Sequence, residues 1–277
     1  MAISYTQQGY QGIRMRDRFW QLDGSEKQGV AYRLGMAGAK LFAEQKLAVP
    51  GLEHADSLLR EGVLALAQGG KRGDLVGWDV EGDWHVFEAK GRSSVSGIDA
   101  VLTESKGQAA NIRLVDHESG KKLSPATACG SVMDLSRDPL AIHVRDPDGE
   151  PGEETVYRVR GEAAISAHYN LIRALMESED ELRAESLAEE GEEDVVVRVG
   201  SIRLAEIELG IHETVYNAIL DPATNWSEFG PRFANGWEPR WREIAARPGR
   251  TLAQEGPWSI GLDGYFVRLS RNRVWPV

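Results

Sequence analysis

The sequence predicts an α/β protein with a central sheet of mixed strand direction and helices on the faces of the sheet. Short apolar runs typical of strands alternate with segments of helical composition through the middle of the chain. With 277 residues, the chain is long enough for one large domain, or for a core with a substantial addition. Its apolar fraction of 42% and charged fraction of 27% are ordinary for a globular protein.

Two helices are predicted near the N-terminus. Residues 30–47 are rich in alanine and other helix formers. Gly35 and Gly38 lower the helix propensity of this segment by up to about 1 kcal/mol each, but they permit close packing against a neighbour. Residues 52–68 form the second predicted helix, which ends at a pair of glycines.

A β-hairpin is predicted next. Residues 74–80 and residues 84–90 are apolar, strand-like segments. The short polar segment between them supplies the turn, in which Gly82 is free to adopt a positive φ. This hairpin contains the residues on which the functional interpretation depends.

The later elements continue the alternation of helices and strands. The predicted helices cover residues 98–115 and 162–176, and the predicted strands cover residues 139–145, 155–160, 194–199 and 202–209. The second of these helices places its large apolar side chains on one face, at spacings of three and four.

The net charge of −11 is concentrated in one segment. Residues 177–194 hold ten acidic residues and one Arg, whereas residues 228–277 hold eight Arg and five acidic residues. The acidic segment is interpreted as a connector. The predicted domains are a core at residues 1–176, which includes an N-terminal tail, the connector at 177–194, and an α+β extension at 195–277. Total acidity therefore does not exclude a nucleic-acid partner.

Several classes of protein are excluded by what the sequence lacks. No apolar run approaches the roughly 18 residues that a membrane-spanning helix needs, and no secretory signal is visible. Cys129 is the single cysteine, which excludes a disulfide within the chain and a cysteine-based zinc site. There is neither a zinc-hydrolase His pair nor a Gly-rich phosphate loop. A cytoplasmic protein without membrane contact is expected.

Strand register decides which side chains of the hairpin lie together. If the turn centres on Gly82, residues whose numbers sum to about 164 are opposite, so Asp74 faces Lys90 and Val76 faces Glu88. Alternate side chains share one face of a strand. This register places Asp74 on the same face as Glu88 and Lys90, and a shift of one residue would separate them.

This cluster has the composition of a site for a hard cation. Two neighbouring carboxylates repel each other unless a cation lies between them, and oxygen ligands favour Mg²⁺ or Mn²⁺. The backbone carbonyl of Ala89 is a further candidate ligand. A lysine beside the metal, here Lys90, would orient or help deprotonate an attacking water.

The hairpin resembles the PD-(D/E)XK, or restriction-endonuclease-like, nuclease superfamily. The resemblance rests on Arg72-Gly-Asp74, a strand, a turn and Val86-Phe-Glu-Ala-Lys-Gly91. It covers roughly residues 30–145 and implies that the core has the restriction-endonuclease-like fold. It also implies that Asp74 and Glu88 are metal ligands and that Lys90 is the catalytic lysine. The proline that usually precedes the first acid is Gly73 here.

The same resemblance implies roles for three residues outside the hairpin. Many members carry Gln or Lys on the following helix, which implies a catalytic role for Gln108 and a nucleic-acid contact for Lys106. An acid on the N-terminal core helix is a frequent additional ligand, and Glu44 is the candidate. The implied activity is Mg²⁺-dependent endonuclease cleavage, in a setting such as restriction, phage defence, repair or toxin action. DNA is the expected substrate, although the motif itself does not separate DNA from RNA. Many members are dimers, so a homodimer or a regulatory protein partner is expected.

The C-terminal extension offers further candidate contacts to nucleic acid. Five of the eight tryptophans lie there, between Trp226 and Trp275. A mixture of aromatic and basic side chains suits stacking on bases and contact with phosphates, although large aromatics are more often buried or at a protein interface. The candidate arginines are Arg240, Arg242, Arg247 and Arg250.

Alternatives remain open for the site and for the function. Asp79 and Asp83 are other first acids, but Asp83 lies in the turn and Asp79 has the opposite face parity. A surface ion pair among Asp74, Glu88 and Lys90 is the simplest alternative to a nuclease site, although charges rarely interrupt an apolar strand for packing reasons. The alternative functions are a ribonuclease and a non-catalytic module that binds a partner protein.

Overall fold

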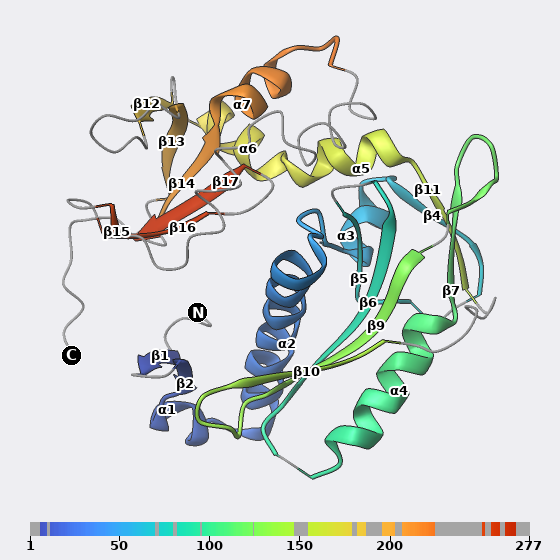
Figure 1. Cartoon of the computed structure of the whole chain (residues 1–277), viewed down its shortest axis with the longest axis vertical. Helices are drawn as coiled ribbons and strands as arrows, with labels where there is room; N and C mark the ends of the chain where they lie inside the picture. Colours follow the sequence, from blue (N-terminus) through green and yellow to red (C-terminus); the bar gives the residue numbers. More distant parts are fainter. Residues whose placement is uncertain are drawn as a thin grey trace. The chain divides into compact units, whose positions relative to one another are not determined.

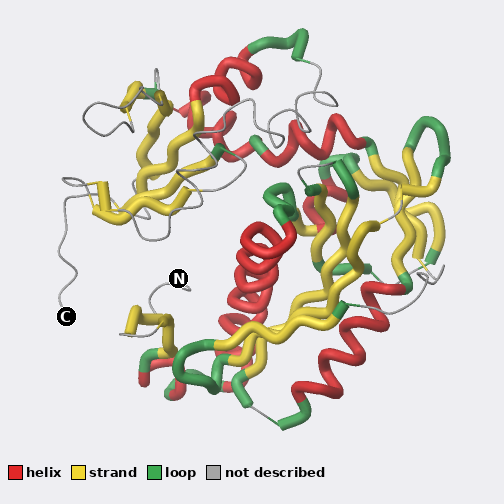
Figure 2. Tube along the Cα trace, viewed as in Figure 1, coloured by secondary structure: helices red, strands yellow, loops and turns green. Residues whose placement is uncertain are grey.

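The structure of the protein is a computed structural model. It describes residues 6–9, 12–69, 72–79, 82–94, 96–123, 125–146, 155–178, 182–186, 196–202, 207–224, 251–252, 256–260 and 264–269. The chain divides into two compact units, Met1–Ala164 and Ile165–Val277. Both units combine helices and strands, as Figure 1 and Figure 2 show. The predicted α/β class is confirmed.

The first unit is organised around a five-stranded sheet with the strand order β10-β9-β6-β5-β3. Its strands are β3 (Glu53–His54), β5 (Leu75–Trp78), β6 (Trp84–Arg92), β9 (Pro125–Asp134) and β10 (Ala141–Arg145). β6 and β9 are parallel, and the other neighbouring pairs are antiparallel. The sheet is therefore mixed, as the sequence predicts.

Helix α2 (Gly24–Leu47) covers one face of this sheet (Figure 1). Its start is fixed by a capping box, in which the Asp23 side chain accepts the N–H of Glu26 at 2.9 Å. The helix packs directly on β6, because a Cβ atom at Gly91 would collide with the carbonyl oxygen of Ala31. Odd-numbered residues of β6 therefore face α2.

Helix α4 (Ile98–Ala110) covers the opposite face (Figure 1). A Cβ atom at Gly130 of β9 would lie 2.5 Å from the backbone nitrogen of Lys106, so only glycine permits this close approach. Gly130 is the partner of Glu88 in the parallel pairing of β6 and β9. Even-numbered residues of β6 therefore face α4.

A second mixed sheet belongs to the same unit. Its order is β4-β11-β7-β8, with β4 (Leu64–Gln68), β7 (Ile112–Asp116), β8 (Lys122–Leu123) and β11 (Thr155–Val159). β11 and β7 are parallel, whereas β11 and β4 are antiparallel. The remaining elements of the unit are β1 (Thr6–Gly9), β2 (Gly12–Met15), α1 (Asp17–Trp20), α3 (Ala55–Arg60) and the start of α5 (Gly161–His168).

The second unit is built on a six-stranded sheet with the order β12-β13-β14-β17-β16-β15. Its strands are β12 (Arg183–Ser186), β13 (Val196–Ile202), β14 (Ile207–His212), β15 (Thr251–Leu252), β16 (Gly256–Ile260) and β17 (Tyr265–Leu269). The helices α6 (Asn170–Ser178) and α7 (Glu213–Leu220) also belong to it. Among the residues that the structure describes, no helix is long and apolar enough to cross a membrane.

Two predicted helices are wrong in part, because long-range strand pairing overrides local composition. Residues 52–68 form the short α3 between two strands, and Gly62, with a φ of 71°, follows α3. Residues 98–115 form a helix only as far as Ala110, after which β7 begins. Both β4 and β7 pair with β11, which lies far away in the sequence.

The predicted helix at residues 162–176 is interrupted at Tyr169. The Tyr169 ring stacks on Tyr265 with ring centroids 5.6 Å apart, and the Tyr265 hydroxyl donates to the carbonyl of His168 at 3.1 Å. The second compact unit begins at Ile165, within α5. Within the predicted acidic connector, β12 is a paired strand, and residues 179–181 and 187–194 lie outside the described residues.

Candidate functional site

The hairpin of β5 and β6 has a register two residues away from the predicted one. Val76 pairs with Val86 and Leu75 pairs with Phe87, so Asp74 lies opposite Glu88 rather than Lys90. The turn is centred one residue closer to the N-terminus than predicted, because the N–H of Asp79 donates to the carbonyl of Asp83 at 2.9 Å. Gly82 has a φ of 88°, as predicted. A shift of two residues preserves face parity, so the predicted cluster still forms.

Asp74 is held in place by the backbone on both sides. Its Oδ2 accepts the N–H of Ala89 at 2.9 Å, and its carbonyl oxygen accepts the N–H of Ala55 at 3.0 Å. The Asp74 carboxylate is thereby tied to the residue between Glu88 and Lys90. The predicted ligand role of the Ala89 carbonyl stays a prediction, whereas the Ala89 amide has a defined structural role.

Glu88 is 4% exposed, yet it carries a carboxyl group. Burial raises its pKa to about 7, with a further contribution from the negative charge of Asp74. One oxygen, Oε1, accepts a hydrogen bond from the ammonium of Lys90, and the other, Oε2, is buried without a hydrogen-bond partner. An unpaired buried carboxylate oxygen is costly, and it is an available ligand for a cation.

Lys90 joins the two acids on the face of β6 that is turned towards α4. Its Nζ lies 3.7 Å from Oδ2 of Asp74 and forms a close ion pair with Glu88. Burial lowers the pKa of Lys90, but its hydrogen bond to Glu88 and the charges of Glu88, Asp74 and Glu104 outweigh that effect and raise it. Lys90 is therefore a cation that stays charged beside the two carboxylates.

A cavity of about 230 Å³ opens where α4 passes over Glu88 and Lys90. Its lining residues are Arg72, Glu88, Lys90, Gln108, Asn111, Ile112 and Thr155. Gln108 donates through Nε2 to Glu104 at 3.3 Å, while its buried Oε1 has no hydrogen-bond partner. Two unpaired oxygens, from Glu88 and Gln108, thus belong to residues that line one cavity.

Lys106 and Glu44 do not join Glu88 and Lys90 in this way. Lys106 contributes its backbone to the contact of α4 with Gly130, and it is not among the residues that line the cavity. Glu44 lies on α2, which covers the face of β6 opposite to Glu88. The predicted role of Glu44 as an additional ligand stays a prediction.

Asp79, an alternative first acid, has a separate role at the turn end of the hairpin. Its Oδ2 lies 2.9 Å from Nε2 of His85, and its Oδ1 accepts the N–H of Asp83. Both Asp79 and His85 are buried. This pair stabilises the turn, and it leaves Asp74 as the acid that meets Glu88.

Tyr32 of α2 is a residue that the sequence interpretation missed. Its hydroxyl lies 2.7 Å from Nε2 of His54, and Nδ1 of His54 accepts the N–H of Asp56 at 3.1 Å. Since Nδ1 is an acceptor, neutral His54 carries its proton on Nε2 and donates it to the Tyr32 oxygen. The phenol hydrogen of Tyr32 is then available to another acceptor.

The Tyr32 hydroxyl is also close enough to the acidic cluster to sense its charge. Burial, followed by the negative charges of Asp74 and Asp56, raises the pKa of Tyr32. The phenol therefore stays protonated and remains a donor. No local sequence signal marks this residue, because its partner His54 lies in β3. Gly130, by contrast, was detectable as a glycine inside an apolar segment, which indicates close backbone approach.

In the part of the chain that the structure describes, no cluster of three or more His, Cys, Asp or Glu side chains could hold a metal ion. The two carboxylates of Asp74 and Glu88, with the free oxygen of Gln108, still fit a hard cation that keeps most of its waters. The four candidate arginines of the C-terminal extension, from Arg240 to Arg250, lie outside the described residues.

Comparison with known proteins finds no match: no family model, no curated protein and no solved structure is significantly similar to this chain. The function is therefore inferred from the chemistry of Asp74, Glu88 and Lys90 and their surroundings.

Proposed function

We propose that this protein is a Mg²⁺-dependent endonuclease with a restriction-endonuclease-like core, and that it hydrolyses phosphodiester bonds of DNA. One observation carries the proposal: the fixed carboxylate of Asp74 lies opposite the buried Glu88, whose Oε2 is unpaired, with Lys90 beside both. A structural ion pair has no need of a second carboxylate or of a buried oxygen without a partner. The roles in restriction or phage defence, and as a homodimer, are expectations that accompany this proposal.

Each residue of the cluster has a role in this proposal. Asp74 and Glu88 would hold the cation, with the Gln108 amide oxygen and the Ala89 carbonyl as further candidate ligands. When bound, Mg²⁺ supplies Lewis-acid stabilisation of the phosphate and a more acidic water. Lys90 places a positive charge where the attacking water and the charge of the reacting phosphate would lie.

Tyr32 is proposed to contact the substrate from the α2 side. Its phenol hydrogen is available because His54 donates to the oxygen, and the neighbouring acids keep the phenol protonated. A phosphate oxygen is a suitable acceptor for such a donor. Tyr32 would then position the phosphate without taking part in proton transfer.

Incubation of the purified chain with plasmid, linear DNA and RNA, in Mg²⁺, Mn²⁺ or EDTA, tests the proposal. We expect cleavage that needs the metal, and a loss of at least about 100-fold in Glu88→Gln and in Lys90→Met. The matched controls are Glu118→Gln and Lys121→Met, since both residues are exposed in the turn between β7 and β8. Both controls should cleave at the rate of the unsubstituted protein.

Metal binding separates this function from a non-catalytic interaction module. Calorimetry should detect Mn²⁺ binding to the unsubstituted chain and a loss of that binding in Glu88→Gln. Full cleavage by Glu88→Gln would disprove the assignment of the site. Absence of both cleavage and Mn²⁺ binding would favour the interaction module instead, and cleavage of RNA alone would identify a ribonuclease.

A further inference from the structure

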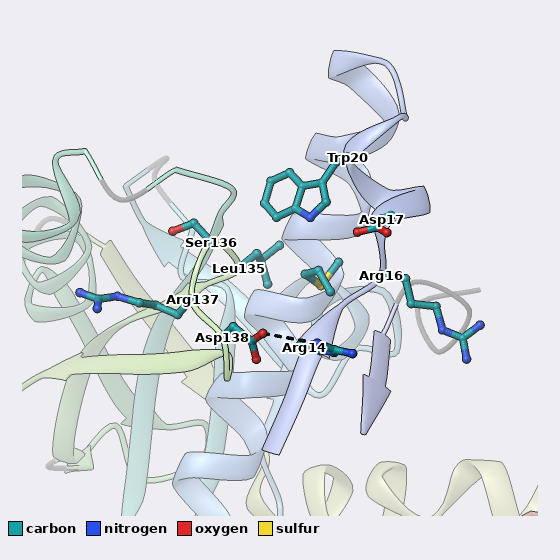
Figure 3. Close-up of a pocket in the computed structure, with 9 residues that line it drawn as sticks. Arg14, Arg16, Asp17, Trp20, Leu135, Ser136, Arg137 and Asp138 are labelled. Atoms are coloured by element: carbon teal, nitrogen blue, oxygen red, sulfur yellow. Dashed lines mark ion pairs between the residues drawn. The ribbon is translucent and has the colours of Figure 1, made fainter. Parts of the chain in front are cut away.

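A second cavity, of about 330 Å³, lies in the first unit beside the N-terminal helix α1 (Figure 3). It is lined by three arginines, an indole and a hydroxyl, together with two acids and two apolar residues. The lining residues are Arg14, Met15, Arg16, Asp17, Trp20, Leu135, Ser136, Arg137 and Asp138. None of these residues belongs to the cluster of Asp74, Glu88 and Lys90.

Trp20 is held at the surface by a buried neighbour. Trp20 is 41% exposed. Its neighbour Phe19 is fully buried in the core with Met15, Leu34 and Leu135. The two rings meet edge to face, with centroids 4.9 Å apart and planes at 77°. Phe19 therefore anchors the short helix to the core, next to the exposed Trp20. An exposed, oriented indole is suited to stacking on a base.

The three arginines extend in different directions, and Arg137 forms an ion pair of 3.4 Å with the buried Asp134. In Figure 3, Arg16 and Arg137 extend in opposite directions from the cavity, and Arg14 lies between them. Arg14 forms a long ion pair of 3.7 Å with the exposed Asp138, which is a weak interaction in water. Within the described residues, Arg16 has no ion-pair partner. Charges that diverge in this way fit the successive phosphates of a chain better than a single small anion.

The local charge also differs from that of the whole chain. Residues 1–50 hold seven Lys and Arg against four Asp and Glu, in a protein with a net charge of −11. The lining of the cavity itself holds three Arg and two Asp, a small excess of positive charge that favours a polyanion.

The cavity is connected to the candidate nuclease site by the strand β6. The N–H of Leu135 donates to the carbonyl of Arg92 at 2.8 Å, and Arg92 is the last residue of β6. Lys90 lies two residues earlier, about 7 Å along the strand, and neighbouring strands are about 5 Å apart. The backbone at Leu135 therefore lies on the order of 10 Å from that of Lys90, with the Leu135 side chain packed on the α2 side of the sheet.

We propose that this cavity binds single-stranded nucleic acid that flanks the reacting phosphodiester. Trp20 stacks on an unpaired base, and Arg14, Arg16 and Arg137 contact phosphates of the same strand. A duplex keeps its bases stacked inside and offers no face to the indole, so a single strand is the ligand. This inference rests on the proposed nuclease function and adds the strandedness of the substrate.

Binding of a fluorescein-labelled 12-mer of single-stranded DNA to the full chain in EDTA tests the inference, because no cleavage takes place without the metal. Fluorescence anisotropy should give a dissociation constant that rises roughly ten-fold in Trp20→Ala and much less in Trp20→Phe, which keeps an aromatic ring. Arg16→Ala and Arg137→Ala should each reduce the slope of log K against log salt by about 0.7. The 12-mer in RNA form and as a duplex is measured in parallel.

The matched control is Arg18→Ala, which removes the same charge two residues further along, in the short helix α1 that follows Arg16 and outside the cavity. It should leave both the affinity and the salt slope closer to those of the unsubstituted chain than Arg16→Ala does. Equal effects of these two substitutions, unchanged affinity in Trp20→Ala, or equal loss of duplex binding in Trp20→Ala would each overturn the inference. Such results leave metal-dependent cleavage intact, whereas full cleavage by Glu88→Gln would refute the nuclease site and leave this binding unaffected.

Discussion

The Oδ2 atom of Asp74 accepts a hydrogen bond from the backbone N–H of Ala89 at 2.9 Å. This bond ties the residue before β5 to the residue between Glu88 and Lys90. A carboxylate is used here as a backbone partner, so that its position is fixed by the sheet and not by a side-chain rotamer alone. The bond gives Asp74 a structural role and a proposed chemical role, and the two can be separated by substitution.

Asp74→Asn should keep the acceptor and remove the charge, whereas Asp74→Ala should remove both. We expect Asp74→Ala to be about 1–3 kcal/mol less stable than Asp74→Asn, because the buried amide of Ala89 then lacks a partner. Both substitutions should abolish metal-dependent cleavage. Denaturant unfolding measures the difference in the free energy of unfolding, and equal stability of the two would contradict the role of this hydrogen bond.

The stability of the metal-free protein should fall as the pH rises from about 4.5 to about 7. The pKa of Glu88 is raised from its ordinary value of 4.5 to about 7 by burial and by Asp74. Between these pH values the folded chain retains a proton that the unfolded chain has released, so the free energy of unfolding decreases, by on the order of 3 kcal/mol. The contribution is complete below pH 4.5 and lost above 7.

Urea unfolding in EDTA at several pH values checks this dependence. Glu88→Gln cannot ionise, so its stability relative to the unsubstituted chain should rise across the same pH range. The exposed control Glu118→Gln should follow the unsubstituted chain at every pH. Parallel curves for Glu88→Gln and the unsubstituted chain would show that Glu88 ionises normally in the folded state.

Tyr32→Phe should slow cleavage by roughly 10- to 100-fold, because it removes a donor to a charged phosphate oxygen. The free energy of unfolding should change by only about 1 kcal/mol, because Tyr32, whose hydroxyl bonds His54, is 43% exposed. Single-turnover kinetics at saturating Mg²⁺ measures the effect. Tyr216→Phe, in the second unit, is the control and should cleave normally; the same rate in Tyr32→Phe would remove Tyr32 from the site.

Gly91→Ala should destabilise the first unit by about 3 kcal/mol or more, since the new methyl group would collide with the carbonyl oxygen of Ala31 and force α2 away from β6. Gly107→Ala is the matched control, because a Cβ atom there meets nothing within 4 Å. It should stabilise α4 by up to about 1 kcal/mol. Thermal unfolding of both variants measures the contrast, and a tolerated Gly91→Ala would contradict the close packing of α2.

Some features of the site follow from local sequence. The hairpin was predictable because apolar strand residues flank a turn that contains Gly82, and face parity was predictable because alternate side chains share a face. The exact partner of Asp74 was not, because the position of the turn sets the register. Asp74 and Glu88 still share a face because the observed register differs from the predicted one by two residues. A difference of one residue would have placed them on opposite faces.

Other features could not be predicted, because they depend on contacts between distant segments. Local composition predicts β4 and β7 as the ends of helices, whereas both strands pair with β11. The same holds for Tyr32, whose role depends on its contact with His54. The break at Tyr169 likewise depends on Tyr265, almost a hundred residues away.

The sequence by itself determined the α/β class, the hairpin and the three charged residues on one face of it. These depend on short-range periodicity and turn composition, which act over a few residues. The tertiary structure decided the pairing of Asp74 with Glu88, the burial that raises the pKa of Glu88, and the approach of α4 at Gly130. Each of these depends on desolvation or on backbone packing between segments that meet only in the folded chain.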